Sequence, residues 1–296
     1  MNPLEKGKNL LVARIAYPAV IALGVFLHFI MLGYHAGLIA ATYIPVIFGA
    51  LAITFLERWF PHRDAWRAQT PEILTDAVFM GVVQVVWPRI LAFFLAITLL
   101  KYFNNHDLNF ESLWPHPWPV PLQAAGMILT ADFFRYWLHR VSHEVPLLWR
   151  FHAVHHSPHR LYWVNVGRFH PIDKALQFLF DAMPFIILGV SENVLALYFV
   201  FYSINGFFQH CNIEVRLGFL NYIISGPELH RWHHSKFPQE SNQNYGNNLI
   251  VWDLLFGTRF LPDGKQVDEL GLKNRDYPMT FPSQMKSPFI KGLEQG

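Results

Sequence analysis

Long apolar runs separated by short polar segments make up the first half of the chain. Residues 10–34 and 38–56 are almost continuously apolar, and each run is close to the ~20 residues that cross a bilayer as a helix. The residues between them, His35-Ala36-Gly37, are typical of a short turn. The first run lacks a small-residue cleavage site and a second run follows it, which favours a membrane helix over a signal peptide.

A third apolar run covers residues 73–100 and is interrupted by Trp87-Pro88-Arg89. Because proline removes a helical hydrogen bond, this run predicts either one kinked span or a re-entrant pair. The polar, proline-rich stretch over 101–121 predicts an interfacial loop. A fourth apolar segment over 122–138 leads directly into His139.

The last long apolar stretch covers residues 175–209. Asp181 and Pro184 divide it, and Ser191-Glu192-Asn193 has the composition of a helix start. We therefore expect a shallow hairpin that dips into the membrane or covers a site formed by the preceding residues. The chain from Gly257 onward is polar and rich in proline, which predicts an extension packed on the surface.

Composition supports membrane insertion. Hydrophobic residues make up 52% of the chain and charged residues 15%, whereas soluble domains carry about 25% charged residues. The net charge of +2 and the scattered basic residues give no nucleic-acid signature, so no nucleic-acid partner is expected. Cys211 is the only cysteine, which excludes an intrachain disulfide.

Basic residues also predict orientation. The N-terminus and the 57–71 loop are the basic sides, and Lys101 lies alone on the opposite side. If residues 73–100 cross once, the 122–138 segment returns the chain to the basic side, which the positive-inside rule identifies as the cytoplasm. The expected fold is therefore all-α: a multi-pass integral membrane protein with about four transmembrane helices and a helical cytoplasmic cap.

Histidine is concentrated in the segment that follows. Eleven of the sixteen histidines lie between His139 and His234. They include an H-x-x-x-H pair and two H-x-x-H-H triplets, of which about 0.05 copies are expected by chance at this histidine content. The members of the three groups are His139 and His143; His152, His155 and His156; and His230, His233 and His234.

This spacing favours metal binding. Residues three and four apart share one face of a helix, so each group is expected to direct several imidazole nitrogens at one spot. Imidazole suits iron, zinc, copper and nickel. Eight ligands are too many for one tetrahedral ion, so the pattern predicts two ions in a shared site. The scattered histidines are expected to be surface or core residues: His28, His35, His62, His106, His116 and His159.

At these groups the sequence closely resembles the fatty acid hydroxylase / sterol desaturase superfamily of integral-membrane non-haem di-iron enzymes. The resemblance covers roughly residues 120–262. The motifs that carry it include Trp137-Leu138-His139-Arg140, Phe151-His152-Ala153-Val154-His155-His156, Phe208-Gln209-His210-Cys211-Asn212, His230-Arg231-Trp232-His233-His234 and Asn244-Tyr245-Gly246-Asn247-Asn248. We accordingly divide the chain into transmembrane helices and loops (1–121), a catalytic region (122–262) and a polar tail (263–296).

The resemblance implies two iron ions bound by the eight grouped histidines and by His210, with zinc possible in purified samples. The full implied ligand set is His139, His143, His152, His155, His156, His210, His230, His233 and His234. His170, in Arg168-Phe169-His170-Pro171, is either a further family histidine or a helix-entry residue before the proline. Asp253 and Asn244 are candidates to orient imidazoles, or serve ordinary packing and capping.

The implied activity is O2-dependent oxidation of a lipid C–H bond, with hydroxylation preferred over desaturation and the substrate a sterol, fatty-acyl or ether lipid. The chain has no G-x-G-x-x-G fingerprint and no haem-domain signature, so a separate electron-donor protein or reductase is an expected partner. Arg150, Arg160 and Arg168 form either its docking face or a solvated or headgroup-facing patch.

Three other functions compete with this interpretation. A metal transporter would carry ionisable residues inside its spans, but the first two apolar runs contain only Arg14 and His28. A haem protein would use isolated axial histidines rather than H-x-x-H-H triplets. A catalytically inactive, zinc-filled member of the superfamily is compatible with the same motifs and stays open.

Overall fold

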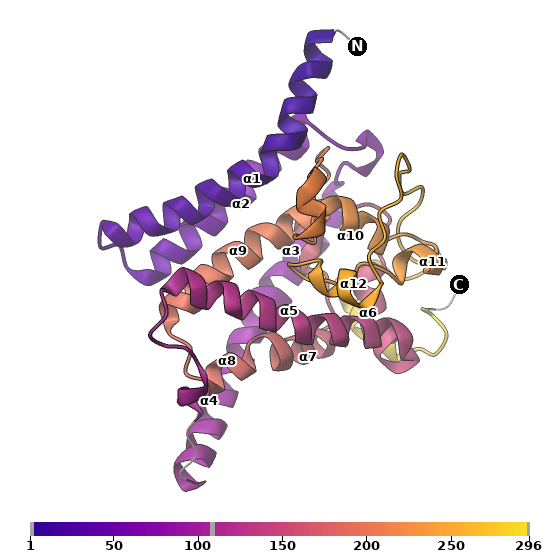
Figure 1. Cartoon of the computed structure of the whole chain (residues 1–296). Helices are drawn as coiled ribbons and strands as arrows, with labels where there is room; N and C mark the ends of the chain where they lie inside the picture. The colour runs from indigo at the N-terminus through magenta and orange to yellow at the C-terminus, as the bar shows by residue number, and fades with distance from the viewer. Residues whose placement is uncertain (1–2, 107–109, 295–296) are drawn as a thin grey trace.

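The computed structural model describes residues 3–106 and 110–294. Every regular element in this part of the chain is a helix, and extended residues pair only in three isolated β-bridges. The all-α prediction is therefore confirmed. Figure 1 shows the helices, from the indigo N-terminal hairpin to the short orange helices around the predicted metal site.

Two antiparallel helices open the chain: α1 (Pro3–Gly33) and α2 (Leu38–Trp59). The predicted turn lies between them, and His35 there adopts a left-handed conformation with φ 58°. Next come α3 (Thr70–Phe79), the π-helical segment η2 (Met80–Val86) and α4 (Trp87–His106), which run on without reversal. A continuous helix excludes the re-entrant pair. The π-helical segment ends at Val86, two residues before Pro88, and proline cannot donate the backbone hydrogen bond that a regular α-helix requires.

Three helices in the described residues are long and apolar enough to cross a membrane: Leu10–Gly33, Leu38–Trp59 and Thr70–Phe103. Large apolar side chains such as Phe26, Leu51 and Phe93 are exposed by about 60% or more on these helices. Exposed apolar surface of this extent fits contact with lipid. The predicted fourth segment, 122–138, lies within α5 and is not one of the three.

The remaining helices form the part of the chain that carries the grouped histidines. Their bounds are α5 (Val120–Glu144), α6 (Pro146–His156), α7 (Pro171–Asp181), α8 (Met183–Ile187), α9 (Glu192–His210), α10 (Pro227–His233), α11 (Pro238–Ser241), α12 (Val251–Phe256) and α13 (Phe281–Lys286). Short 3₁₀ segments lie at η1 (Asp64–Trp66), η3 (Glu111–Leu113), η4 (Trp163–Gly167), η5 (Gly218–Tyr222) and η6 (Ser287–Phe289).

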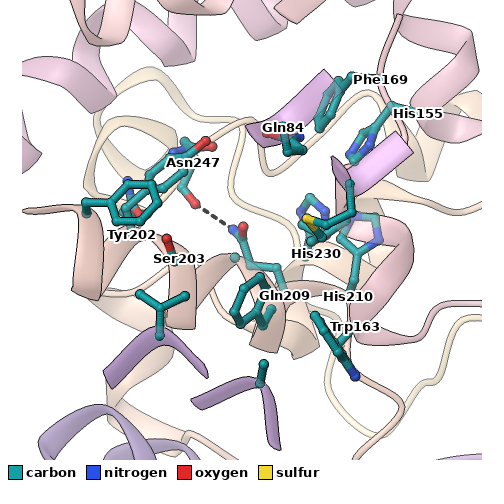
Figure 2. Close-up of a pocket in the computed structure, with 18 of the residues that line it drawn as sticks. Gln84, His155, Trp163, Phe169, Tyr202, Ser203, Gln209, His210, His230 and Asn247 are labelled. Atoms are coloured by element: carbon teal, nitrogen blue, oxygen red, sulfur yellow. Dashed lines mark hydrogen bonds between the residues drawn. The ribbon is translucent and has the colours of Figure 1, made fainter. Parts of the chain in front are cut away.

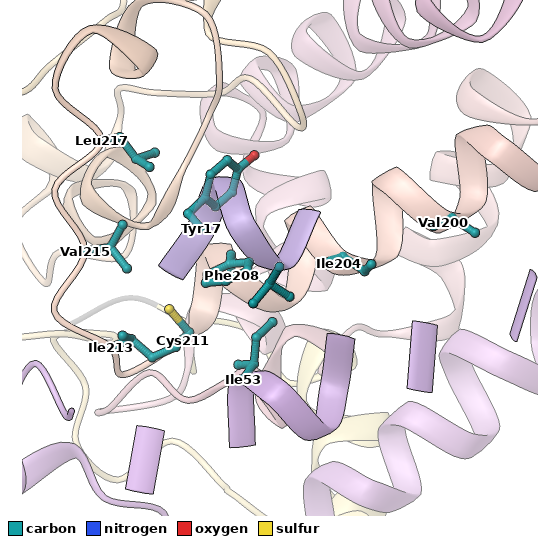
Figure 3. Packing of buried hydrophobic residues seen from close by; sticks show 10 residues of the cluster. Tyr17, Ile53, Val200, Ile204, Phe208, Cys211, Ile213, Val215 and Leu217 are labelled. Atoms are coloured by element: carbon teal, nitrogen blue, oxygen red, sulfur yellow. The ribbon is translucent and has the colours of Figure 1, made fainter. Parts of the chain in front are cut away.

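Helix α9 is the centre of the packing and contacts α1, α2 and α5. Figure 3 shows Ile204 and Phe208 of α9 beside Tyr17 and Ile53, with the extended residues Ile213 to Leu217 closing the cluster. Two glycines permit this approach, because a Cβ at Gly24 or Gly49 would lie within 2.5 or 2.7 Å of the Ile204 side chain. The predicted helix start at Ser191 is confirmed, since Ser191 is the N-cap of α9.

The loop over residues 57–71 packs against the histidine-bearing region. Trp66 lies in a cluster with Leu161 and Trp232, and the Arg63 guanidinium donates hydrogen bonds to the carbonyl oxygens of Val267 and Asp268. The C-terminal segment packs over α6 and α3 through η6 and α13. These contacts place the histidine region on the same side of the three apolar helices as the 57–71 loop.

Candidate metal centre

Nine buried or half-buried histidines converge in two adjacent groups. Within each group the nitrogen atoms that could bind a metal all lie within 4.8 Å of one another. The five-histidine group consists of His139, His143, His152, His156 and His233. The four-histidine group consists of His155, His210, His230 and His234. All nine histidines named from the sequence are thus brought together, and neither group contains any other histidine.

Each H-x-x-H-H triplet contributes to both groups. His152 and His156 of α6 belong to the five-histidine group and His155 to the other, whereas His230 and His234 belong to the four-histidine group and His233 to the other. Helix geometry explains the division. At 3.6 residues per turn, positions four apart differ by about 40° around the axis, while the position three along points about 60° to the opposite side. The expectation that one triplet serves one spot was wrong.

Rings from the two groups lie against each other. The His156 and His234 rings are stacked with centroids 4.4 Å apart, and the His155 and His156 centroids are 5.6 Å apart. His139 and His143 come from α5, and His210 is the last residue of α9. Four helices therefore contribute to the centre, α5, α6, α9 and α10, with His234 directly after the end of α10. The two groups therefore adjoin each other within one continuous cluster of histidine rings.

Six of the nine imidazoles have their Nδ1 atoms held by a fixed acceptor. Three acceptors are backbone carbonyls: Tyr245 for His139 at 2.8 Å, Gln243 for His233 at 2.8 Å and Arg168 for His155 at 3.2 Å. Three are side-chain oxygens: Asn242 for His143 at 3.0 Å, Asp173 for His152 at 2.9 Å and Asn165 for His210 at 2.8 Å. An acceptor at Nδ1 requires the proton there and leaves the Nε2 lone pair for a metal.

Five of these six imidazoles, and His156, have a buried Nε2 atom without a partner. No hydrogen-bond partner reaches Nε2 of His139, His143, His152, His156, His210 or His233. In the four-histidine group, the Nε2 atoms of His230 and His234 lie 3.1 Å apart. Buried acceptors without partners are costly, and cations bound between them would remove that cost. Nitrogen donors of this kind suit iron, zinc, copper or nickel, so the residues fit a metal centre.

Burial also keeps these imidazoles in the neutral form that binds metal. Burial lowers the pKa of His210 and of His233 to about 3. Burial and the charges of neighbouring histidines lower the pKa of His139 and His155 well below the ordinary value. The centre therefore offers uncharged nitrogen donors at neutral pH.

Sequence reasoning missed three side chains that orient imidazoles: Asp173, Asn165 and Asn242. Asp173 is a buried carboxylate in the first turn of the amphipathic helix α7, and that isolated acidic position was the available signal. The proposed orienting residues Asp253 and Asn244 contact no imidazole. Asp253 accepts hydrogen bonds from the backbone of Tyr245 and Gly246, so it holds the loop whose carbonyl serves His139.

Asn244 organises the same loop, since its amide donates to the carbonyl oxygens of Leu229 and Phe260 and its backbone has φ 54°. His170 belongs to neither group. It is the N-cap of α7, and its Nδ1 accepts a hydrogen bond from the backbone of Ile172. The helix-entry interpretation of His170 is therefore correct.

An apolar cavity of about 290 Å³ leads to the histidines. Its walls come from α2, η2 and α9 and include Val46, Ile47, Phe199 and Phe207. Members of both groups line it: His139, His152, His155, His210 and His230. Figure 2 shows His155, His210 and His230 at one end and Tyr202, Ser203 and Asn247 at the other.

A second pocket, of about 320 Å³, shares no lining residue with the apolar cavity and is more polar than it; we call it the polar pocket. It is lined by His143 and His156 together with Trp149, Lys236 and Asn242. The Trp149 ring lies 4.9 Å from the His143 ring and 5.3 Å from the His156 ring, centroid to centroid. The two histidine groups thus lie between an apolar cavity and a polar pocket.

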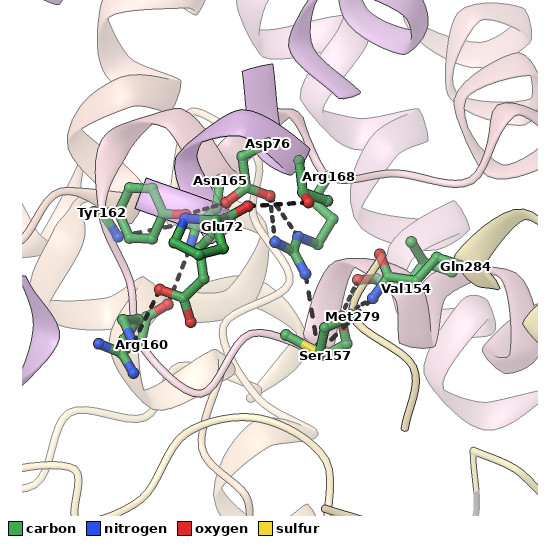
Figure 4. Close-up of polar contacts among 12 residues, drawn as sticks. Glu72, Asp76, Val154, Ser157, Arg160, Tyr162, Asn165, Arg168, Met279 and Gln284 are labelled. Atoms are coloured by element: carbon green, nitrogen blue, oxygen red, sulfur yellow. Dashed lines mark hydrogen bonds and ion pairs between the residues drawn. The ribbon is translucent and has the colours of Figure 1, made fainter. Parts of the chain in front are cut away.

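The basic patch expected from Arg150, Arg160 and Arg168 does not form one exposed face. Arg168 is 1% exposed and forms an ion pair with Asp76, at 2.5 Å from Nη2 to Oδ1. Figure 4 shows Asp76 between Arg168 and Tyr162, whose hydroxyl also donates to it. This pair fixes the Arg168 backbone, whose carbonyl accepts the His155 hydrogen bond. Arg168 is therefore excluded from a docking face.

Comparison with known proteins places this arrangement in a family. The fatty acid hydroxylase family matches residues 124–258. The chain is 34% identical over 244 residues to the ornithine lipid hydroxylase OlsE of Rhizobium tropici, covering 81% of this chain and 72% of that protein.

Two further relatives match over smaller shares of their length. The alkylglycerol monooxygenase of Xenopus tropicalis is 33% identical over 63% of this chain and 38% of its own. A protein of Neurospora crassa named as a probable Delta(7)-sterol 5(6)-desaturase is 28% identical over 68% of this chain and 57% of its own. No solved structure matches the chain significantly. With its match to the bacterial hydroxylase over most of both lengths, this chain belongs to the fatty acid hydroxylase / sterol desaturase superfamily.

Proposed function

We propose that this protein is a membrane-bound di-iron enzyme that uses O2 and external electrons to hydroxylate a C–H bond of a lipid. The observation that carries the proposal is the pair of histidine groups beside an apolar cavity. Relatives named as a lipid hydroxylase, an alkylglycerol monooxygenase and a sterol desaturase support a fatty-acyl, ether-lipid or sterol substrate.

The nine grouped histidines would hold two iron ions, one in each group. When bound, the ions would supply the reductive activation of O2 and the removal of hydrogen from an unactivated C–H bond. The chain contributes position. Six fixed Nδ1 hydrogen bonds direct Nε2 lone pairs into the centre, and burial keeps the donors neutral.

The apolar cavity supplies binding and dryness. Its walls include residues of α2 and of η2, which belong to candidate membrane spans. A lipid chain would enter sideways between these helices and displace water from beside the histidines. Hydroxylation is our first choice of outcome and desaturation the alternative. Mass spectrometry of the product, alcohol or alkene, distinguishes them.

A cytoplasmic centre and four membrane crossings complete the proposal. The centre packs on the side of the basic 57–71 loop, and α5 would return the chain to that side after the third span. Electrons would come from a separate donor protein. The polar pocket beside Trp149 is the better candidate for its approach than the three arginines, because it reaches the imidazoles of His143 and His156.

Metal analysis of the full-length protein, purified in detergent after expression with added iron, tests the proposal. We expect about two irons per chain and no haem absorbance. His155→Ala and His233→Ala, one from each group, should lower the metal content, whereas His170→Ala, a histidine outside both groups, should not. Metal content that is unchanged in the first two variants would contradict the site.

Two outcomes would favour other functions. Two zinc ions per chain with no product from any lipid would favour a catalytically inactive zinc-binding member. Metal flux into proteoliposomes would favour a transporter. Iron at both sites with an oxidised lipid product supports the proposed activity.

A further inference from the structure

The cavity that reaches the histidines is not uniformly apolar. Arg135, Ser203, Gln209 and Asn247 line it together with Tyr202. Figure 2 shows Tyr202, Ser203 and Asn247 at the end opposite His155 and His230. Arg135 precedes His139 by one helical turn of α5, about 6 Å along the axis. The polar residues and the histidines therefore border the same small space.

The Arg135 guanidinium is buried and incompletely hydrogen bonded. The residue is 6% exposed, and its Nε has no hydrogen-bond partner. Its nearest contacts are long: 3.7 Å from Nε to Oδ2 of Asp181, and 3.5 Å from Nη2 to Oδ1 of Asn247. A buried guanidinium with unused donors carries a large cost, which an oxygen acceptor in the cavity would reduce.

The surroundings of Arg135 define the acceptor. Asp181 already balances the buried positive charge, so a neutral oxygen is favoured over a second anion. The Gln209 amide donates to the carbonyl oxygens of Ser225 and Asn247 and is not available. Among the described residues, the Ser203 hydroxyl has no hydrogen-bond partner, and Figure 2 shows it directed into the cavity. Arg135 and Ser203 thus offer free donors to the cavity, and the Tyr202 hydroxyl and the Asn247 amide lie beside them on its wall.

We infer that Arg135 and Ser203 form a subsite for a neutral carbonyl or ether oxygen of the lipid, and that this subsite places the attacked C–H bond within a few carbons of that oxygen. The inference rests on the proposed function. The apolar part of the cavity, between α2 and η2, then takes the rest of the chain toward the membrane. If this inference holds, oxidation far along the hydrocarbon tail is not expected.

The test measures binding first, so that it does not depend on turnover. Full-length protein in nanodiscs is titrated with a hexadecyl glycerol ether, hexadecanamide and hexadecane, each displacing a fluorescent hydrocarbon from the cavity. We expect Arg135→Met to weaken binding of the ether and the amide about ten-fold or more, as for loss of a hydrogen bond to a charged donor. Binding of hexadecane should stay within about two-fold.

The matched control is Arg140→Met, five residues along the same helix, where the arginine pairs with Glu144 at the surface. It should leave all three affinities unchanged. If Arg135→Met does not fold because Asp181 is left unpaired, the double variant Arg135→Met/Asp181→Asn replaces it, and Ser203→Ala gives a second, smaller selective loss. Equal loss for hexadecane and the polar probes, or no loss for any, would overturn the inference.

Product analysis provides the second readout. Wild-type protein should place the hydroxyl within a few carbons of the polar oxygen, and Arg135→Met should spread the product positions. Selective binding without any product would contradict the proposed oxygenase function and leave the subsite standing. A product at the far end of the tail would overturn the subsite and leave the oxygenase function standing.

Discussion

Replacing Asp173 by asparagine should weaken metal binding while leaving the fold in place. The Asp173 carboxylate is 3% exposed, and it accepts hydrogen bonds from His152 Nδ1 at 2.9 Å and from the Gln177 amide at 3.2 Å. Burial by itself would raise the pKa of Asp173, but the interactions with His152, the positive charge of Arg135 and the hydrogen bond from Gln177 together outweigh burial and lower the pKa. The residue is therefore a carboxylate that fixes the His152 tautomer.

Asparagine offers one acceptor where the site needs two. Both neighbours are donors, and Gln177 cannot turn its amide without losing the hydrogen bond that its oxygen accepts from Lys174. Either a donor faces a donor, or His152 moves its proton to Nε2 and ceases to be a ligand. Exchanging a charged for a neutral hydrogen bond costs about 1 kcal/mol or slightly more, equivalent to about 5- to 15-fold, near the lower end of the 10- to 100-fold typical for such partners.

Chelator competition followed by metal analysis measures the effect, with thermal unfolding of each sample to establish folding. Asp181→Asn is the matched control, because Asp181 is a buried carboxylate of the same helix that contacts no imidazole and pairs with Arg135. It should change metal affinity by less than about two-fold. Folded Asp173→Asn protein with wild-type metal affinity would refute the role of Asp173.

Three further outcomes are expected. The hydrogen bond from His62 lowers the pKa of Glu214 from 4.5 to about 2, so the stabilisation by the Glu214 carboxylate is present above pH 4.5 and is lost as the pH falls toward 2. Between these pH values, Glu214→Gln should lose about 1 kcal/mol less stability than wild type after solvent screening. Equal acid sensitivity of the two proteins in thermal unfolding would contradict this. Asp76→Asn should lower the free energy of unfolding by about 3 kcal/mol or more, because it leaves Arg168 buried and unpaired. Asp64→Asn, at an exposed carboxylate, should not lower it, so equal unfolding midpoints for the two variants would argue against the ion pair. Removing metal with a chelator should lower the unfolding midpoint. The free energy of unfolding should fall by about 4 kcal/mol where the free ion had been 1,000-fold above its Kd, and an unchanged midpoint would mean that the centre does not bind the ion.

The sequence was sufficient for the helical class, the apolar runs and the eight grouped histidines, because each depends on local spacing, whereas His210 was identified only through the family resemblance. It could not assign triplet members to groups. That division depends on how α6 and α10 face each other, so His155 joins His230 while His156 joins His233. The crossing of two helices separated by about seventy residues leaves no local pattern.

The acceptors that orient the imidazoles were equally hidden. The carbonyls of Tyr245, Gln243 and Arg168 belong to the backbone, and any residue type could supply them. The buried pair of Arg168 and Asp76 was misjudged for a related reason. In the sequence, Arg168 is grouped with Arg150 and Arg160 and is therefore interpreted as part of an exposed basic patch. Its partner Asp76 is ninety-two positions away, and only the fold shows that the two are paired.

The division of each triplet between two groups has a consequence for assembly. Helix α6 carries members of both histidine groups, and so do α10 and the residue that follows it. If each group holds one ion, as proposed, the first ion to bind would fix the two helices in the register that the second ion requires. Occupancy should then rise together at the two positions, and half-filled protein should be scarce at any metal supply. The last members of the two groups, His233 and His234, are synthesised some ninety residues after His139, so neither group can be completed before this whole segment has been made.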